Sequence, residues 1–270
     1  MVVKEVLCKS ALSPSGIPTI QYALNPYTGC EHKCIYCYAR FMKKFTGHQE
    51  EWGEFVDVKI NVPQVLAGEL AKKTRGVVGL STVTDPYQPL DKKYKLTRKC
   101  LQKLLTYRFP VTIQTKSSLV LRDIDLLKQF PACEVGFTIT TVDDEVRKKC
   151  ELRSSPPKER LAALQRLHKE GLRTYAFMGP ILPFITDTDE NIRSMIQSVA
   201  DVNVDCLLVD RLNMRWGVWF SVLNFLRQNY PKLIPQYKRI FWSKNNYYEK
   251  LKSKILKLCR EYNVNCEFCY

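Results

Sequence analysis

Three cysteines within eight residues constrain this chain more than any other feature, because their thiols must come together wherever the rest folds. Cys30, Cys34 and Cys37 stand in the spacing CxxxCxxC within the stretch 25–40, NPYTGCEHKCIYCYAR. Thiols this close in sequence can share one metal centre, and a tetrahedral zinc site or an ordinary iron-sulfur cluster takes four protein ligands. The loop supplies only three cysteines. The spacing therefore predicts a four-iron cluster with one iron open to a non-protein ligand.

Two other interpretations of these thiols stay open. A zinc ion could take His32 as a fourth ligand, although His32 stands only two residues from Cys30 and from Cys34, a tight reach for tetrahedral geometry. Free cysteines are also common as small buried core residues. Three thiols in register ahead of Tyr-Ala-Arg favour the cluster over both.

The pattern CxxxCxΦC, in which Φ is the aromatic Tyr36, resembles the signature of the radical S-adenosylmethionine enzymes. The longer string NPYxGCxHxCxYCYAR resembles the branch that contains spore photoproduct lyase. The resemblance implies a [4Fe-4S] cluster on Cys30, Cys34 and Cys37, with S-adenosylmethionine (SAM) at the open iron and Tyr36 beside the cofactor. An electron passed into the sulfonium would release a 5′-deoxyadenosyl radical. The electron would come from a donor such as a ferredoxin or flavodoxin.

The chain is long enough for one barrel-sized domain. It has 270 residues and no low-complexity linker, so we expect one domain over 1–270, and a monomer. Its 11 cysteines would suit a small disulfide-rich secreted protein, but the chain is too long for that class and its first ten residues lack the apolar core of a signal peptide. No apolar run nears the length of a membrane span. We therefore expect reduced thiols, a cytoplasmic location and no membrane insertion.

Short apolar runs alternate with helical patterns along most of the chain. The runs with strand character lie at 19–23, 77–81, 111–115, 134–140, 173–178 and 206–209. Segments with helical spacing lie at 62–74, 97–107, 121–130, 143–149, 157–170 and 190–202. Such alternation predicts parallel βαβ units, and six units are too few for a closed eightfold barrel. We predict an α/β fold in which an N-terminal arm (1–18) leads into a partial (β/α)6 barrel (19–210), the fold that the radical SAM resemblance also implies.

The segment 211–270 is predicted to be a C-terminal extension, helical and rich in aromatic and basic residues, that closes one side of the barrel. Most of its rings, from Trp216 to Tyr248, are interpreted as core, although such a surface could also stack unpaired bases. The final helix 249–262 is lysine-rich. Cys259, Cys266 and Cys269 near the end either hold a second metal or cluster or are packed terminal thiols.

Polar side chains follow the predicted strands, where a parallel barrel carries its chemistry. Lys116 is predicted to bind the SAM carboxylate, because a cation directly after a strand points into the barrel mouth and QTKS resembles the segment that does this in spore photoproduct lyase. By the same match, Thr138 stands where that enzyme has a serine near the cofactor. Ser81, Thr82 and Thr140 are further candidates to contact the cofactor. Each could equally be a solvated or turn-forming residue.

Catalytic candidates lie after the second strand, in LSTVTDPY. The resemblance places Thr82 where spore photoproduct lyase has its radical-quenching cysteine, and a hydroxyl hydrogen is too strongly bound to do the work of a thiol. Tyr87 could substitute as a redox-active phenol. Asp85 is the third catalytic candidate in this stretch. Farther along, Glu151 and Arg160 are expected either to pair with each other or to bind substrate or cofactor.

The charge of the chain favours a polyanionic substrate. Lys and Arg number 42 against 27 Asp and Glu, a net charge of +15, and the best phosphate sites are the final helix and the loop 92–95. Charge alone names no partner. We predict a radical SAM enzyme that cleaves SAM reductively and abstracts hydrogen from a nucleic acid. The alternatives are a radical SAM enzyme acting on a lipid, peptide or small metabolite, and a non-catalytic, metal-containing nucleic-acid-binding protein.

Overall fold

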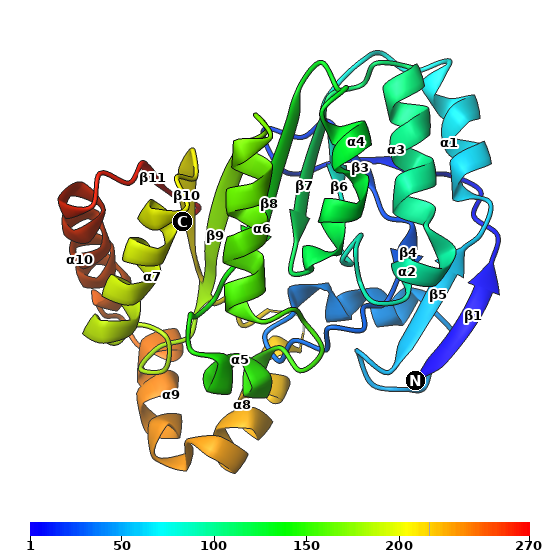
Figure 1. The fold of residues 1–270 in the computed structure, drawn as a ribbon. Helices are drawn as coiled ribbons and strands as arrows, with labels where there is room; N and C mark the ends of the chain where they lie inside the picture. The colour runs from blue at the N-terminus through cyan, green and yellow to red at the C-terminus, as the bar shows by residue number, and fades with distance from the viewer. Residues whose placement is uncertain (216) are drawn as a thin grey trace.

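The computed structural model describes residues 1–215 and 217–270; Trp216, one of the aromatic residues noted above, lies outside the described residues. Its main feature is an eight-stranded sheet in the order β11-β10-β9-β8-β7-β6-β3-β2 (Figure 1). Every neighbouring pair from β3 to β11 is parallel, and only β2 pairs antiparallel, with β3. The sheet is open, because its end strands β11 and β2 do not pair with each other. The predicted fold class, an α/β fold on a partial rather than closed barrel, is confirmed.

The predicted strands form the centre of this sheet. The bounds are β2 (Leu12–Pro14), β3 (Tyr22–Leu24), β6 (Val78–Leu80), β7 (Val111–Thr115), β8 (Cys133–Thr138), β9 (Arg173–Ile181), β10 (Cys206–Arg211) and β11 (Cys266–Phe268). β6 is buried along its whole length, as expected for a parallel strand covered on both faces. Strand β11 was not predicted: its three residues lie within the cysteine pair of the tail and pair with β10.

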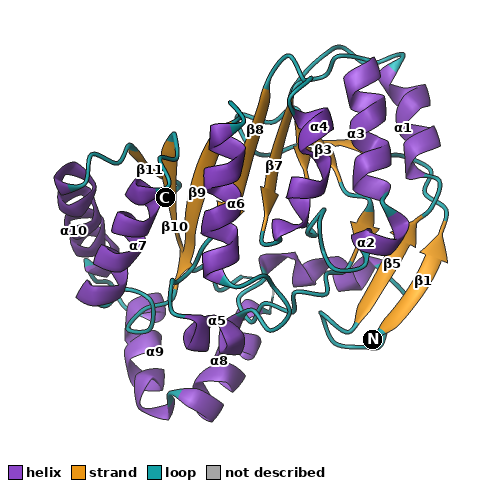
Figure 2. Cartoon of the chain, viewed as in Figure 1, coloured by secondary structure: helices purple, strands orange, loops and turns teal. Residues whose placement is uncertain are grey.

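Helices fill the connections between the strands. They are α1 (Val62–Leu70), α2 (Asp91–Tyr94), α3 (Leu96–Thr106), α4 (Ile124–Leu127), α5 (Asp144–Cys150), α6 (Pro157–Lys169), α7 (Asp189–Asp201), α8 (Val218–Asn229), α9 (Ile234–Trp242) and α10 (Tyr247–Glu261), with the 3-10 helices η1 (Tyr38–Phe45), η2 (Ser118–Asp123) and η3 (Pro231–Leu233). Figure 2 shows α3, α4, α6 and α7 along one face of the sheet. Most of the core lies between the sheet and these helices.

The N-terminal residues are not a free arm. Strand β1 (Val2–Val6) pairs in parallel with β5 (Phe55–Lys59), which also pairs with β4 (Tyr27–Thr28), so that a second, three-stranded sheet forms. Three of the five residues of β1 are exposed, so the strand lacks the apolar run that would mark it. Its partner also lies some fifty residues away in sequence. The short second sheet was therefore missed.

The carboxyl ends of the parallel strands lie together at one edge of the main sheet. In Figure 1 these ends point downward, and the segment after β4, α5, α8 and α9 lie beneath them. A second group of buried residues joins Cys34 and Tyr36 to Leu182, Leu212 and residues of α8 and α9. The extension thus covers part of the edge where the chemistry of such folds is found. Over the described residues, no helix has both the length and the apolar character needed to cross a membrane.

Candidate functional site

The three cysteines of the motif lie on the loop between β4 and η1, at the carboxyl edge of the sheet. Cys30 and Cys34 are buried, Cys37 is half-buried, and all three are free thiols. Burial, then the charges of Asp85, Cys34 and Cys37, raises the pKa of Cys30 well above its usual value. Burial also raises the pKa of Cys34, to about 12. Buried thiols such as Cys30 and Cys34, with raised pKa values, become thiolates only beside a strong cation, so this donor set fits a metal centre.

The loop after β6 holds the cysteine loop (25–37) in place through side chain to backbone hydrogen bonds. Asn25 accepts from the backbone N–H groups of Thr82 and Val83, both at 3.0 Å. The Thr84 hydroxyl donates to the carbonyl of Gly29, and Gln88 accepts from the N–H of Glu31 at 2.9 Å. The segment that was predicted to supply catalytic groups therefore positions the cysteines.

Asp85 is the centre of this contact. Its buried carboxylate accepts from the Thr115 hydroxyl at 2.7 Å, from the Lys116 N–H at 2.8 Å and from the Tyr87 N–H at 2.9 Å. Nε2 of His32 lies 3.1 Å from the same carboxylate. Burial raises the pKa of Asp85, but His32, Thr115 and Lys116 lower it by more, to about 2. Asp85 therefore links the cysteine loop to the end of β7 as an anion with its oxygens already engaged.

A second buried network fixes the other side of the loop. The Tyr36 hydroxyl donates to Glu151 and lies 3.0 Å from the hydroxyl of Thr140. Glu151 also accepts from Thr140 and pairs with Arg160, and both partners of this ion pair are 1% exposed. Burial raises the pKa of Glu151, but the charges of Arg160 and Lys116 lower it by more than burial raises it, so that it falls to about 2. The structure thus shows the Glu151–Arg160 ion pair, one of the two roles expected from the sequence.

Lys116 follows β7 and lies between these networks. Its ammonium is 5.8 Å from the centre of the Tyr36 ring, and it forms no hydrogen bond or ion pair with any described residue. Burial lowers the pKa of this ammonium, but Cys34, Glu151 and Asp85 raise it by more. A cation kept charged and left unpaired beside three thiols can bind an anionic ligand.

His32, the fourth ligand in the zinc interpretation, lies close to other groups. Its Nδ1 is 3.1 Å from the Arg153 carbonyl, and its Nε2 is 3.1 Å from the Asp85 carboxylate without forming a hydrogen bond. Within 1–215 and 217–270, no three His, Cys, Asp or Glu side chains converge on one point closely enough to hold a single ion. A four-iron cluster gives each thiolate its own iron, and so does not require them to converge on a point.

The remaining predicted site residues contact different parts of the fold. Thr82 lies against the loop, where its hydroxyl accepts from Asn25 and its carbonyl accepts from Tyr38. The Ser81 hydroxyl donates to the Leu24 carbonyl, and Thr138 accepts from Gln114. Tyr87 is fully buried under the guanidinium of Arg122, 5.6 Å from its ring centre, so its phenol faces the core. The structure brings Tyr36, Thr140 and Lys116 together and leaves Tyr87 outside the group.

Arg40, which the sequence analysis did not single out, joins the loop to the extension. Its guanidinium donates to the carbonyls of Ile35 and Cys37, each at 3.0 Å, and to the hydroxyl of Ser221 in α8, also at 3.0 Å. The signal for it was present in the motif, because a basic residue three positions after a ligand can reach back to the carbonyls of the loop. The first helix of the extension is therefore part of the wall of the site.

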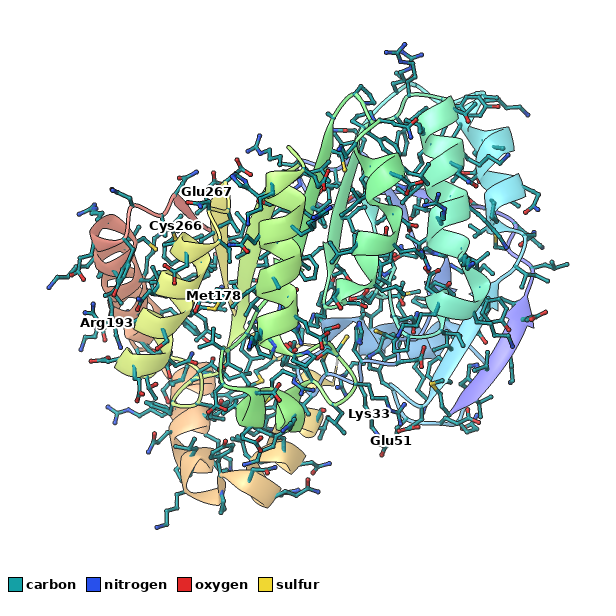
Figure 3. All side chains as sticks on the ribbon, in the orientation of Figure 1. Lys33, Glu51, Met178, Arg193, Cys266 and Glu267 are labelled. Atoms are coloured by element: carbon teal, nitrogen blue, oxygen red, sulfur yellow. The ribbon has the colours of Figure 1, made fainter. Side chains whose placement is uncertain are left out.

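The C-terminal cysteines lie away from this centre. Cys259 is buried in α10, Cys266 belongs to β11 and Cys269 is exposed. Figure 3 shows Cys266 and Glu267 at the upper left of the view and Lys33, from the cysteine loop, near the lower centre. The Cys259 and Cys266 thiols contact each other. Among the described residues no three ligating side chains converge on a single ion here, and a second metal site is not shown.

The fold and this site define an α/β protein that presents three thiols and a free cation at the carboxyl edge of a parallel sheet. The model of the Radical SAM superfamily matches residues 24–199, and the chain belongs to this family of enzymes. It is 36% identical to the uncharacterized protein MJ0683 of Methanocaldococcus jannaschii over 84% of this chain and 83% of that protein. The family implies a [4Fe-4S] cluster and SAM.

Solved structures agree on the fold. Spore photoproduct lyase complexed with a dinucleoside spore photoproduct has a TM-score of 0.73 and 14% identity, covering 99% of this chain and 82% of that one. SuiB of Streptococcus suis, solved bound to its precursor peptide SuiA, has a TM-score of 0.57 and 13% identity, covering 92% and 49%. At these identities the likeness shows the fold alone.

Proposed function

We propose that this protein holds a [4Fe-4S] cluster through Cys30, Cys34 and Cys37, binds SAM with the help of Lys116, and uses it to abstract hydrogen from a nucleic acid. The observation that carries the proposal is that three crowded thiols, two of them buried, lie at the same sheet edge as a charged ammonium that forms no ion pair with a described residue. The thiols can bind the irons of a cluster, and the ammonium can bind the carboxylate of an amino acid beside it.

The residues around the thiols have separate tasks in this proposal. Lys116 pairs with the methionine carboxylate, and Tyr36 is held against Glu151 and Thr140 so that its ring forms the floor beneath that ammonium. His32 and Asp85 fix the loop from the other side. When bound, the cluster supplies the electron that releases methionine and a 5′-deoxyadenosyl radical from SAM. A one-electron donor such as a ferredoxin or flavodoxin would serve as reductant.

Two facts favour a nucleic acid as the substrate. The net charge of +15 fits a partner that carries many phosphates. Spore photoproduct lyase, which shares the fold, has been solved with a dinucleoside lesion bound. The second candidate is a peptide, because SuiB shares part of the fold and binds one. The lyase's own reaction is not carried over, since Thr82 matches the place of its radical-quenching cysteine.

The test is reductive cleavage of SAM by protein reconstituted anaerobically with iron and sulfide. With dithionite and SAM, the wild type should produce 5′-deoxyadenosine, and the variant with Cys30, Cys34 and Cys37 all changed to Ala should lose both the iron and the product. The matched control changes Cys8, Cys133 and Cys269 to Ala, which removes the same number of free thiols elsewhere. Product from the loop variant, or equal loss in the control, would show that the cluster is not on this loop.

A further inference from the structure

One segment of the extension, residues 211–248, carries positive charge without any negative charge. It contains seven of the 42 Lys and Arg residues and none of the 27 Asp and Glu residues of the chain. It runs from the last residue of β10 through α8, η3 and α9 to the first two residues of α10. We call it the acid-free segment. The stretch 92–122 is also free of acidic residues and carries nine Lys and Arg. Two of those nine, Arg98 and Arg122, form ion pairs with Asp residues outside the stretch. What sets 211–248 apart is that its cations lie beside the exposed rings of Phe220 and Trp242.

The cations of the acid-free segment are exposed and unpaired. Arg215, Arg227, Lys232, Lys238, Arg239 and Lys244 are all exposed, and none forms an ion pair with a described residue. Arg211 lies over the rings of Tyr248 and Tyr270, at 5.8 and 5.5 Å from their centres. By contrast, Lys254 of α10 pairs with Asp189, and Lys252 lies over the ring of Phe268. The final helix, favoured from the sequence as a phosphate site, is thus more fully engaged with its own chain.

Aromatic rings stand exposed among these cations. Trp242 is 57% exposed, and it follows Lys238 and Arg239 by four and three positions, so the three side chains share one face of α9. Phe220 is 71% exposed and lies seven positions before Arg227 on α8, again on a shared face. The Trp219 ring lies 4.5 Å from that of Trp242, joining the start of α8 to the end of α9. Although Trp242 packs against Trp219, more than half of its surface stays in water, as does that of Phe220, and such exposed aromatic surface among cations suits a ligand with flat faces.

The acid-free segment borders the site itself. Val218, Val222 and Leu226 of α8 belong to the same buried group as Cys34 and Tyr36. A hydrogen bond from Arg40 of η1 to Ser221 also joins α8 to the segment that follows the cysteine loop. In Figure 1 the segment, coloured from yellow to orange, lies below the carboxyl ends of β9 and β10. A polymer held on α8 and α9 would therefore pass next to the thiols.

We infer that the acid-free segment is the docking surface for an unpaired stretch of DNA or RNA, with phosphates on its cations and a base stacked on Trp242. The inference builds on the nucleic-acid substrate of the proposed function and states where that substrate binds. Six exposed cations that form no ion pair with a described residue attract phosphates regardless of sequence. Exposed rings beside cations bind bases by their faces, which are free only where the strand is unpaired. An acidic protein would use the same charges, but would leave the exposed rings without a role.

The experiment compares two variants that lose the same charge. Lys238→Gln with Arg239→Gln removes two adjacent exposed cations from α9, whereas Lys99→Gln with Lys103→Gln removes two exposed cations one helical turn apart from α3. Binding of the anaerobic reconstituted protein to labelled single strands of about 15 nucleotides is followed by fluorescence anisotropy from about 50 to 200 mM salt. The α9 variant should reduce the log–log salt slope by about 1.4, from two phosphate contacts at about 0.7 each, and the α3 variant should leave it unchanged.

The ring is tested separately from the charge. Trp242→Ala should weaken single-strand binding by on the order of tenfold without changing the salt slope, and Trp242→Phe should retain most of the affinity. An unchanged slope in the α9 variant, equal loss in both charge variants, or tighter binding to duplex than to single strand would overturn the inference. So would a wild type that ignores nucleic acid but binds an acidic flavodoxin through α9. Formation of 5′-deoxyadenosine is scored independently, so loss of docking and loss of radical chemistry are distinguishable.

Discussion

Replacing Arg160 with Met should be one of the most destabilising single changes near the site. Arg160 is 1% exposed, and its guanidinium contacts Glu151, the Ser154 hydroxyl and the carbonyls of Thr138 and Ser155, the last two at 2.7 Å. The substitution leaves the Glu151 carboxylate buried without its cation. Breaking a buried ion pair by removing one partner costs about 3–5 kcal/mol. The two carbonyls that lose their donors move the expected loss toward the upper end of that range.

A double-mutant cycle separates the buried charge from the lost packing. Glu151→Gln combined with Arg160→Met removes both charges, and the Gln side chain can still hydrogen-bond to its neighbours. The double variant should therefore recover at least about 1 kcal/mol relative to Arg160→Met alone, because the cost of an uncompensated carboxylate is gone. The free energy of unfolding is measured by urea titration of anaerobic protein at matched iron content.

The surface ion pair between Lys128 and Glu170 supplies the control. The Lys128 side chain is 47% exposed, so Lys128→Met should cost less than about 1 kcal/mol. If Arg160→Met costs no more than Lys128→Met, or if the double variant is less stable than Arg160→Met alone, then the Glu151–Arg160 network does not stabilise the site in the way argued here.

Two further predictions concern the contacts of the cysteine loop. Lys116→Ala should weaken SAM binding roughly tenfold or more, because one charge-assisted hydrogen bond of about 1.5–3 kcal/mol is lost, while the iron content stays that of the wild type. Equilibrium binding of SAM measures the change, and an unchanged affinity would show that Lys116 does not bind the cofactor. Asp85→Asn should lower the free energy of unfolding by about 1–3 kcal/mol and speed the loss of iron to a chelator. The amide NH₂ of Asn would face the Thr115 hydroxyl and the Lys116 N–H, two donors that the wild-type carboxylate accepts from. A variant that holds iron as the wild type does would show that Asp85 does not position the loop.

The sequence predicted the central strands of the fold because these strands are buried. A parallel strand covered on both faces reads as a short apolar run, as 77–81 does, whereas 111–115 alternates apolar and polar residues in step with its alternating burial. Strand β1 exposes most of its side chains, and β11 lies in a cysteine-rich tail, so neither shows that pattern. An edge strand is specified by a partner distant in sequence, and no local pattern reveals the pairing.

The same limit applies to the site. The thiols, Tyr36 and Lys116 were predictable because the motif and the strand end place them, and the structure brings them together. Tyr87 was expected at the barrel mouth, but the turn in which its N–H donates to Asp85 directs its ring into the core under Arg122. The contact of His32 with Asp85 spans 53 residues of sequence, and nothing local to either residue indicates it.

The cysteine loop is held by contacts to separate parts of the fold, none of which ligates a metal. His32 lies against Asp85 after β6, and Tyr36 donates to Glu151 beyond β8. Arg40 of η1 joins the carbonyls of the loop to Ser221 in α8. Because each contact comes from a different element, the positions of the thiols follow from the sheet and the extension together rather than from the loop alone. A site fixed in this way loses little conformational entropy when ligands bind. It also means that α8, whose exposed face carries the cations and rings of the acid-free segment, is coupled through its buried face to the loop that would generate the radical.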